Sequence, residues 1–253
     1  MLSLRSPWPS VALVATTALL SVLPLVAQAS RTAPGPQPEV GWRRMVERWL
    51  AQEPPENPNN GGSRPVDGDR ICWIAPFAMP ETAVVWSDRP TLTWQSPAGA
   101  VTQVELRPSD DRHPPLVYPI SAANQIRNTP IPLYQLTLDH PLEPDVTYEW
   151  RMYRPVPSLP NVQEPLSRFV RFEVLATESR DRLTTELTQL EQTQTEQGIS
   201  GEEATLQRAQ LFTEQQLWSD LWHTLLSQPD PSEALEGAIA TTLETACTPP
   251  MPE

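Results

Sequence analysis

Few residues in this sequence have the types and spacing that catalysis or metal binding requires. The densest polar group is Asp110 to His113, whose two carboxylates and imidazole could act as metal ligands or as an acid–base pair. No second pair of ligands stands at a metal-binding spacing, so a solvated turn is the stronger interpretation. His140 and His223 have no motif that links them to a nucleophile.

The motifs of common enzyme classes are also missing. The sequence has no Gly-x-Ser-x-Gly elbow, no His-Glu-x-x-His pair and no Gly-rich phosphate loop. All 18 basic residues are Arg, which excludes a Schiff-base or P-loop lysine. The 31 acidic residues bring the net charge to -13, which disfavours nucleic acid binding. We therefore expect a non-catalytic protein without cofactor or metal.

Tryptophan residues are the other candidates for ligand contact. Trp73 and Trp86 lie in a Pro-rich entry segment, and Trp218 and Trp222 lie in an acidic helical stretch. Aromatic rings of this kind can form a platform for a sugar ring or contact a partner, although packing in a core is the simpler role.

The first 29 residues have the three-part layout of a secretory signal peptide. A basic start at Met1 to Arg5 precedes an apolar run from Val11 to Val26, and Ala27-Gln28-Ala29 is a small-x-small cleavage signal. An uncleaved anchor is the alternative, but the run is shorter than the roughly 20 residues of a spanning helix and contains Pro24. We expect an exported protein, periplasmic or extracellular, with no membrane span after cleavage.

Residues 30–70 read as a Pro/Gly-rich linker, because such a composition buries too little apolar surface to offset chain entropy. A short amphipathic helix is predicted inside it at 41–51. This helix either packs on its own domain or frays, which is the favoured interpretation, or docks on a partner or a membrane surface. Its apolar residues are Trp42, Met45, Val46, Trp49 and Leu50.

Residues 71–175 predict an antiparallel β-sandwich. Several short segments alternate apolar and polar residues with a period of two, so that each strand has one buried face and one face toward water. Turns rich in Pro and Asp separate them, as in a two-sheet sandwich. The alternating segments are 91–94, 101–107, 134–138, 148–152 and 169–175, and a further strand around Val117 to Ile120 is less certain.

One motif makes the sandwich prediction more specific. Leu142, Pro144 and Tyr148 stand at the spacing of the turn before strand F in fibronectin type III and other immunoglobulin-like domains, which this stretch resembles. The resemblance implies that the Tyr148 hydroxyl bonds back to the turn backbone. It also implies a buried core Trp, which would be Trp94 or Trp150.

Residues 176–248 predict a C-terminal region of three helices, which makes the fold class α+β. Two stretches, 178–197 and 202–228, lack Pro and Gly, and a last helix begins near Ser232. From residue 176 onward the chain has 14 acidic residues against three Arg. A solvated acidic face is the ordinary explanation for this charge, and a docking surface for a basic partner is the weaker one.

The two cysteines, Cys72 and Cys247, bracket the predicted globular part. In an exported protein this arrangement favours one disulfide between them. Free buried thiols and a Cys-based active site are the alternatives, and the active site would need a nearby His.

Four short motifs occur along the chain: the Gly/Arg-rich stretch from Asn59 to Cys72, Arg89-Pro90-Thr91, the set Leu142, Tyr148 and Trp150, and a Trp218-x-Asp220 turn. With these motifs the chain resembles a cyanobacterial exported family catalogued as domain of unknown function 928. The family has no assigned activity and no catalytic residues. Membership implies export and a sandwich with helices.

Three functions remain as hypotheses. The first is a non-catalytic interaction or structural module of the periplasm or cell surface, whose partner is another extracytoplasmic protein. The second is a carbohydrate-binding module that uses exposed Trp residues. The third is a hydrolase built on Asp110, Asp111 and His113.

Overall fold

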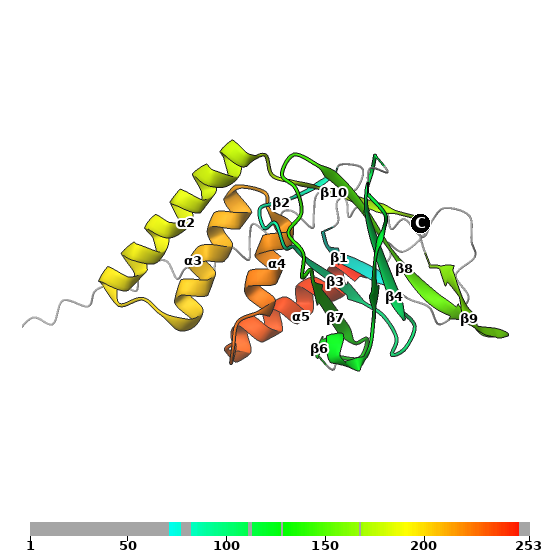
Figure 1. Ribbon diagram of the computed structural model, residues 1–253. Helices are drawn as coiled ribbons and strands as arrows, with labels where there is room; N and C mark the ends of the chain where they lie inside the picture. The colour runs from blue at the N-terminus through cyan, green and yellow to red at the C-terminus, as the bar shows by residue number, and fades with distance from the viewer. Residues whose placement is uncertain (1–70, 77–81, 111–112, 128, 167, 248–253) are drawn as a thin grey trace, which may run out of the picture. The chain divides into compact units, whose positions relative to one another are not determined.

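A computed structural model describes residues 71–76, 82–110, 113–127, 129–166 and 168–247 (Figure 1). All of them belong to one compact unit, Pro36–Glu253. The predicted signal peptide (1–29), the linker (30–70) and the amphipathic helix at 41–51 lie outside the described residues.

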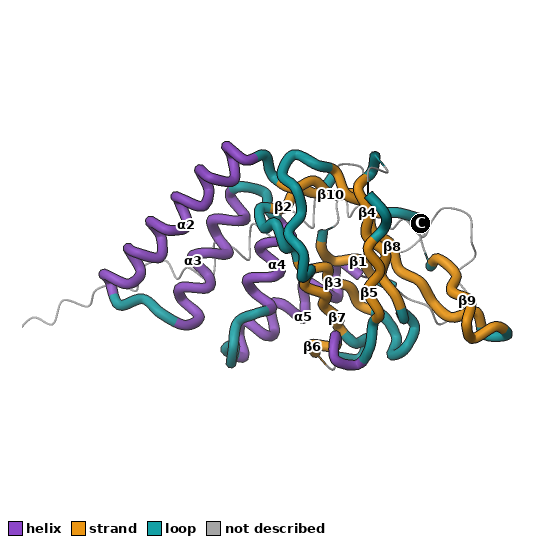
Figure 2. The backbone as a smooth tube through the Cα atoms, viewed as in Figure 1, coloured by secondary structure: helices purple, strands orange, loops and turns teal. Residues whose placement is uncertain are grey.

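The β-region consists of two sheets, shown in orange in Figure 2. Every strand pair is antiparallel except β2 with β10, which run parallel. The first sheet has the order β1 (Cys72–Ala75), β3 (Thr91–Gln95), β7 (Leu133–Thr137), β6 (Gln125–Arg127). The second has the order β2 (Ala83–Val85), β10 (Val170–Val174), β8 (Thr147–Val156), β4 (Gln103–Pro108), β5 (Leu116–Pro119), with β9 (Leu159–Pro165) also paired to β8.

These strand orders are those of an immunoglobulin-like sandwich. From edge to edge, the strands of the first sheet correspond to A, B, E and D. In the second sheet, β10, β8 and β4 correspond to G, F and C. The prediction of an α+β fold with an antiparallel sandwich is therefore confirmed. The short strands β2, β6 and β9 lacked a clear alternating pattern in the sequence.

Large aromatic side chains fill the space between the two sheets. Trp94 from the first sheet and Trp150 from the second are both fully buried, with ring centroids 6.4 Å apart. Trp150 also donates from Nε1 to the carbonyl oxygen of Pro76 at 3.2 Å. Each such side chain stabilises the fold by about 1.5–3 kcal/mol through burial. Both candidates for the core Trp thus occupy the core.

The turn before β8 is closed as the motif implies. The backbone N–H of Glu143 donates to the Tyr148 hydroxyl oxygen at 2.9 Å. Tyr148 is itself buried and stacks on Phe172, with ring centroids 5.8 Å apart. One residue therefore ties the turn to the core, because its ring packs inside while its hydroxyl holds the loop.

Four helices follow the sandwich among the described residues, where the sequence predicted three. The stretch expected as one helix from 202 to 228 breaks at Gln216, which has a positive φ of 58°. The Leu217 N–H bonds to the Phe212 carbonyl at 2.9 Å, which is the six-residue closure of a Schellman motif. Gln carries no signal for this conformation, so the break was invisible in sequence. The helices are α2 (Thr177–Gln197), α3 (Gly201–Glu214), α4 (Trp218–Leu226) and α5 (Glu233–Cys247).

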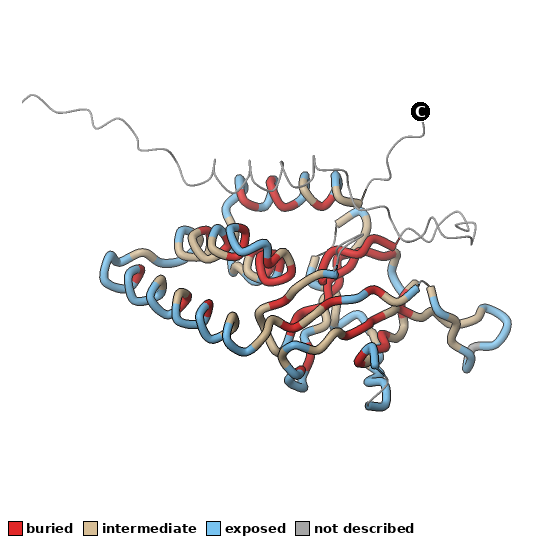
Figure 3. The backbone as a smooth tube through the Cα atoms, turned by 90° about the horizontal axis from the view of Figure 1, so that it is seen from above, coloured by how far each residue is buried: buried red, intermediate tan, exposed pale blue. Residues whose placement is uncertain are grey.

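Helices α4 and α5 pack against the outer face of the first sheet at β1 and β3, and every residue of these two strands is buried. Figure 3 shows the buried segments in red. Ile74 and Leu133 from this sheet belong to the same apolar cluster as the helices. Thr91 and Thr93, whose alternation predicted a face toward water, are buried as well. That part of the prediction is wrong for β3, since a second layer buries both of its faces.

Polar contacts also join the helices to the segment after β2. The Asp220 carboxylate in α4 accepts the backbone N–H groups of Trp86 at 2.8 Å and Ser87 at 3.2 Å. Burial raises the pKa of Asp220 to about 6, although these N–H donors act in the opposite direction. Arg180 in α2 pairs with Asp88 at 2.9 Å. Two helices thus hold one loop of the sandwich.

The predicted disulfide is confirmed. Cys72 in β1 and Cys247 at the end of α5 are bonded, with Cα atoms 5.4 Å apart and 175 residues between them in sequence. Neither thiol is free, which removes the two alternatives of buried thiols and a Cys-based active site. The bridge fastens the last helix to the first strand.

Candidate functional site

Two of the four Trp residues proposed for ligand contact are buried. Trp73 lies in the sandwich core, where its ring meets Trp150 edge-on with centroids 4.3 Å apart. Trp222 lies in the core between the helices and the first sheet. The expectation that Trp73 belongs to an exposed patch is wrong, because β1 packs against the sandwich core on one side and the helices on the other. Trp222, a candidate for ligand or partner contact, is also buried.

The other two Trp residues are partly buried against the helices. The Trp86 ring packs on Phe212, with centroids 5.8 Å apart, and its Nε1 donates to Thr184 Oγ1 at 3.3 Å. Trp218 packs against the same apolar cluster. These contacts use the rings for packing, so the Trp residues give no support to a sugar-binding platform.

Of the polar residues considered for a hydrolase site, Asp110 and His113 are both exposed, and Asp111 lies outside the described residues. His140 pairs with Asp139 at 2.6 Å, with both side chains about two-thirds exposed, and this contact lowers the pKa of the Asp139 carboxyl. Within the described ranges, no group of three His, Cys, Asp or Glu residues could hold a metal ion.

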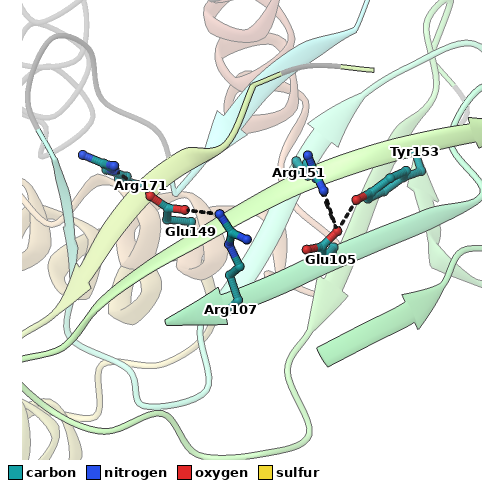
Figure 4. A network of polar contacts seen from close by, with 6 residues as sticks. All are labelled: Glu105, Arg107, Glu149, Arg151, Tyr153 and Arg171. Carbon is teal, nitrogen blue, oxygen red and sulfur yellow. Dashed lines mark hydrogen bonds and ion pairs between the residues drawn. The ribbon is translucent and has the colours of Figure 1, made fainter. Parts of the chain in front are cut away.

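The second sheet brings together a set of charged side chains on its outer face (Figure 4). We call this surface the open face and define it by Glu105, Arg107, Glu149, Arg151, Tyr153, Phe169 and Arg171. Cross-strand register creates it, because β4, β8 and β10 place these outward positions side by side. The described helices make their main contacts with β1, β2 and β3 instead.

Glu149 bridges two arginines from the neighbouring strands. Its Oε2 accepts from Arg107 Nη2 at 3.1 Å and its Oε1 accepts from Arg171 Nε at 2.8 Å. Charge-assisted bonds of this kind are stronger than bonds between neutral groups. The Glu149 residue is only 5% exposed although it stands on an outward position.

Glu105 has a matching environment one step along the sheet. Its Oε2 accepts from Arg151 Nη2 at 3.1 Å and from Arg151 Nε at 3.3 Å, and it also accepts the Tyr153 hydroxyl. Burial, followed by the contact with Glu105, raises the pKa of Tyr153. Glu105 is 8% exposed.

Phe169 joins the two halves of the network. The guanidinium of Arg107 lies 4.0 Å from its ring centroid, and that of Arg151 lies 4.1 Å from it. Both distances are well inside the range of a cation–π interaction. The expectation that Glu149 faces water was therefore wrong in part, since arginine stems and one ring cover it.

A hairpin formed by the end of β8 and by β9, residues 154–165, extends the second sheet and carries exposed apolar side chains. Leu159 is 55% exposed and Val162 is 46% exposed. Two side-chain contacts hold the base of the hairpin, Arg154 to Glu164 at 2.6 Å and Thr102 to Gln163 at 2.7 Å. Figures 1 and 3 show it reaching away from the sheets.

Prolines remove backbone N–H donors from this hairpin and restrict its backbone. Pro160 and Pro165 lie in β9 and have no N–H to donate, so the free edge is a poor template for another strand. Pro155 and Pro157 stiffen the other side. The hairpin therefore offers side chains, not a backbone ladder, to a partner.

The sequence contained signals for part of this surface. Alternation placed Glu149, Arg151 and Arg171 on one side of their strands, which the structure confirms. It gave no indication of β9, because four prolines interrupt residues 154–165. The position of Phe169 over two arginines depends on cross-strand register, which no local pattern encodes.

Taken together, the fold and the surface define an immunoglobulin-like sandwich with one helix-covered face and one charged open face. No family model, curated protein or solved structure matches the chain. Membership in the exported cyanobacterial family therefore stays a prediction. None of the helices in the described part of the chain is long and apolar enough to cross a membrane.

Proposed function

We propose that this protein is an exported, non-catalytic interaction module of the periplasm or cell surface, which binds another protein through the second sheet. The observation that carries the proposal is the pair of exposed apolar side chains, Leu159 and Val162, on the proline-rich hairpin. Exposed apolar groups at such a site gain free energy when a partner covers them.

The second sheet is the side of the sandwich that is available to a partner. Helices α4 and α5 already occupy the outer face of the first sheet. The hairpin loses little conformational entropy on binding, because its prolines restrict the free chain. A partner that covers the hairpin therefore uses an element that is already ordered.

Export is supported by the signal-peptide layout of residues 1–29 and by the disulfide, which suits an oxidising compartment. Protein recovered from the extracytoplasmic fraction should begin at Ser30 and show no alkylatable thiol by mass spectrometry. An intact Met1 in the mature protein, or recovery of the protein only from the cytoplasm, would contradict the proposal.

The binding proposal is tested by affinity capture with matched variants. Wild-type protein should retain one partner in a stoichiometric amount, and the double variant Leu159→Ser/Val162→Ser should lose it. Val117→Ser serves as control, because Val117 on the edge strand β5 is similarly exposed, at 52%. Equal capture by all three proteins would rule out the hairpin as the binding element.

A further inference from the structure

We propose that Pro115 and Pro119 prevent the edge of the second sheet from pairing with the same edge of a second copy of this chain. The inference concerns β5, the last strand of that sheet, and its backbone. It goes beyond the proposed function, because it does not depend on any other partner.

Strand β5 is an exposed edge with apolar side chains. It stands last in the order of the second sheet and, among the described strands, it pairs with β4 alone. Leu116 is 37% exposed and Val117 is 52% exposed. An exposed apolar edge is a template for pairing between two chains, because its outward backbone groups can bond to another strand. Unless a feature of β5 blocks this pairing, the edge favours a second copy.

The bonding to β4 fixes which backbone groups of β5 point outward. The Ile120 N–H donates to the Thr102 carbonyl oxygen at 2.9 Å, in agreement with the register of the two strands. Successive residues of an antiparallel strand alternate between bonding to the neighbour and pointing away from it. The backbone groups of Leu116 and Tyr118 therefore face β4, as those of Ile120 do. Those of positions 115, 117 and 119 face the free edge.

Two of these three outward positions are proline. Pro115 and Pro119 have no N–H, so Val117 supplies the only outward donor of this edge. If a second copy paired antiparallel with Val117 opposite its counterpart, Pro115 of each chain would stand opposite Pro119 of the other. The bonds that need an N–H at these positions would be missing, and the proline rings would crowd the approach. Such a pairing would keep only the bonds between the two Val117 residues.

Strand β9, in the hairpin, shows the same placement of proline. The Leu166 N–H donates to the Met152 carbonyl oxygen at 2.8 Å, and Pro165 stands opposite Tyr153. By the same alternation, the backbone of Pro165 faces away from β8. Both strands therefore present carbonyl oxygens and few donors to a neighbouring chain, which weakens any ladder between two copies.

The first test follows hydrogen exchange of the mature wild-type protein by NMR. The Val117 N–H should exchange at least about tenfold faster than the Tyr118 N–H, because only the second is bonded to β4. The rate should not change with protein concentration. Equal protection of both groups would show that another segment or a second copy already covers the edge, and it would overturn the inference.

The second test restores the missing donors in the variant Pro115→Val/Pro119→Val. Sedimentation equilibrium should show self-association at least about tenfold tighter than in the wild type, because each restored hydrogen bond adds net stability. Exchange of the Val117 N–H should then slow as the protein concentration rises. A folded double variant that associates no more than the wild type would overturn the inference.

Pro114→Val is the matched control, because it adds the same side chain and N–H one residue earlier, outside β5. It should associate no more than the wild type. Equal association of this control and the double variant would mean that added apolar surface, and not the edge, joins the chains. If the double variant does not fold, Pro119→Val alone is compared with the control in the same way. None of these outcomes depends on the capture of a partner.

Discussion

The two outer faces of the sandwich both bury some outward-pointing side chains, but in different ways. On the first sheet, the short side chains Thr91 and Thr93 are buried in β3, which packs against α4. On the second sheet, Glu105 and Glu149 are buried by the stems of neighbouring arginines and by Phe169. The first sheet is covered by helices, whereas on the second sheet the side chains of the sheet itself cover the two glutamates.

The difference lies in side-chain length, because both faces show the same period-two pattern. Threonine is too short to shield its neighbours, so a sheet face made of it packs against another element. Arginine has a long apolar stem that can lie over a neighbour while its charged end reaches water. Long, oppositely charged residues on outward positions therefore indicate an open face, and short ones indicate a covered face.

The largest effect should come from releasing the layer that covers the first sheet. Replacing both cysteines, Cys72→Ser with Cys247→Ser, opens a loop closed across 175 residues. The loop-entropy model gives a loss of about 5 kcal/mol in the free energy of unfolding. Urea denaturation of the two proteins measures this. A change below about 1 kcal/mol would mean that packing alone holds α5 in place.

A cavity under the helices should have the next largest effect. Leu133→Ala removes a fully buried side chain from the cluster that the first sheet shares with the helices. We expect a loss of about 3 kcal/mol, measured by urea denaturation. Val117→Ala, on the exposed side of β5, is the control and should cost less than about 0.5 kcal/mol. Similar costs for both variants would show that the first sheet is not packed from outside.

The sequence predicted which side of most strands faces the core, but it could not predict which outward positions another element covers. Alternation identified the inward residues of β4, β8 and β10, and Leu142, Pro144 and Tyr148 predicted the closed turn. The burial of Thr93 could not be predicted, because it depends on helices more than 100 residues away in the chain. The burial of Trp73 could not be predicted either, because it depends on the contact with Trp150 in another strand, whereas its exposure was inferred from the neighbouring prolines.

The open face shows a similar limit. The sequence placed Arg151 and Arg171 outward, but their partners are fixed by the register between β4, β8 and β10. Register follows from the whole set of turns and cannot be derived from one strand. The hairpin escaped prediction because proline normally argues against a strand.

A smaller change in the free energy of unfolding, which depends on pH, is expected from Asp220, where α4 contacts the sandwich. Asp220→Asn weakens the contacts to the Trp86 and Ser87 N–H groups, and we expect a loss of about 2 kcal/mol. Burial raises the pKa of Asp220 to about 6, so the folded state binds this proton more tightly than the unfolded state. The contribution of that proton to stability is therefore full below about pH 4 and is lost as pH rises through about 6.

The sign can be checked by urea denaturation of both proteins at about pH 4.5 and about pH 7. Because the Asn variant lacks this titration, the stability difference between wild type and variant should be larger at the lower pH. A difference that grows with rising pH would show that the N–H donors outweigh burial and that the pKa of Asp220 is not raised.

The smallest effect should come from the open face, because its charges are partly hydrated. Glu149→Gln keeps the shape of the side chain but removes the charge shared by Arg107 and Arg171. Exposed ion pairs contribute about 0–1 kcal/mol, and removing one partner of a buried pair costs more because the other charge loses its compensation, so we expect a loss of about 1 kcal/mol. Glu164→Gln, whose pair with Arg154 is more exposed, is the matched control and should be close to neutral.

Ionic strength provides a second measurement for the same variant. If arginine stems shield Glu149 from solvent, the cost of Glu149→Gln should change little between about 0.1 M and about 1 M salt, because buried pairs are weakly screened. The hydrated pair of Glu164 should lose its small contribution over that range. A cost for Glu149→Gln that disappears at high salt would mean that the open face is a solvated surface, and the contrast between a covered and a self-covering face would not hold.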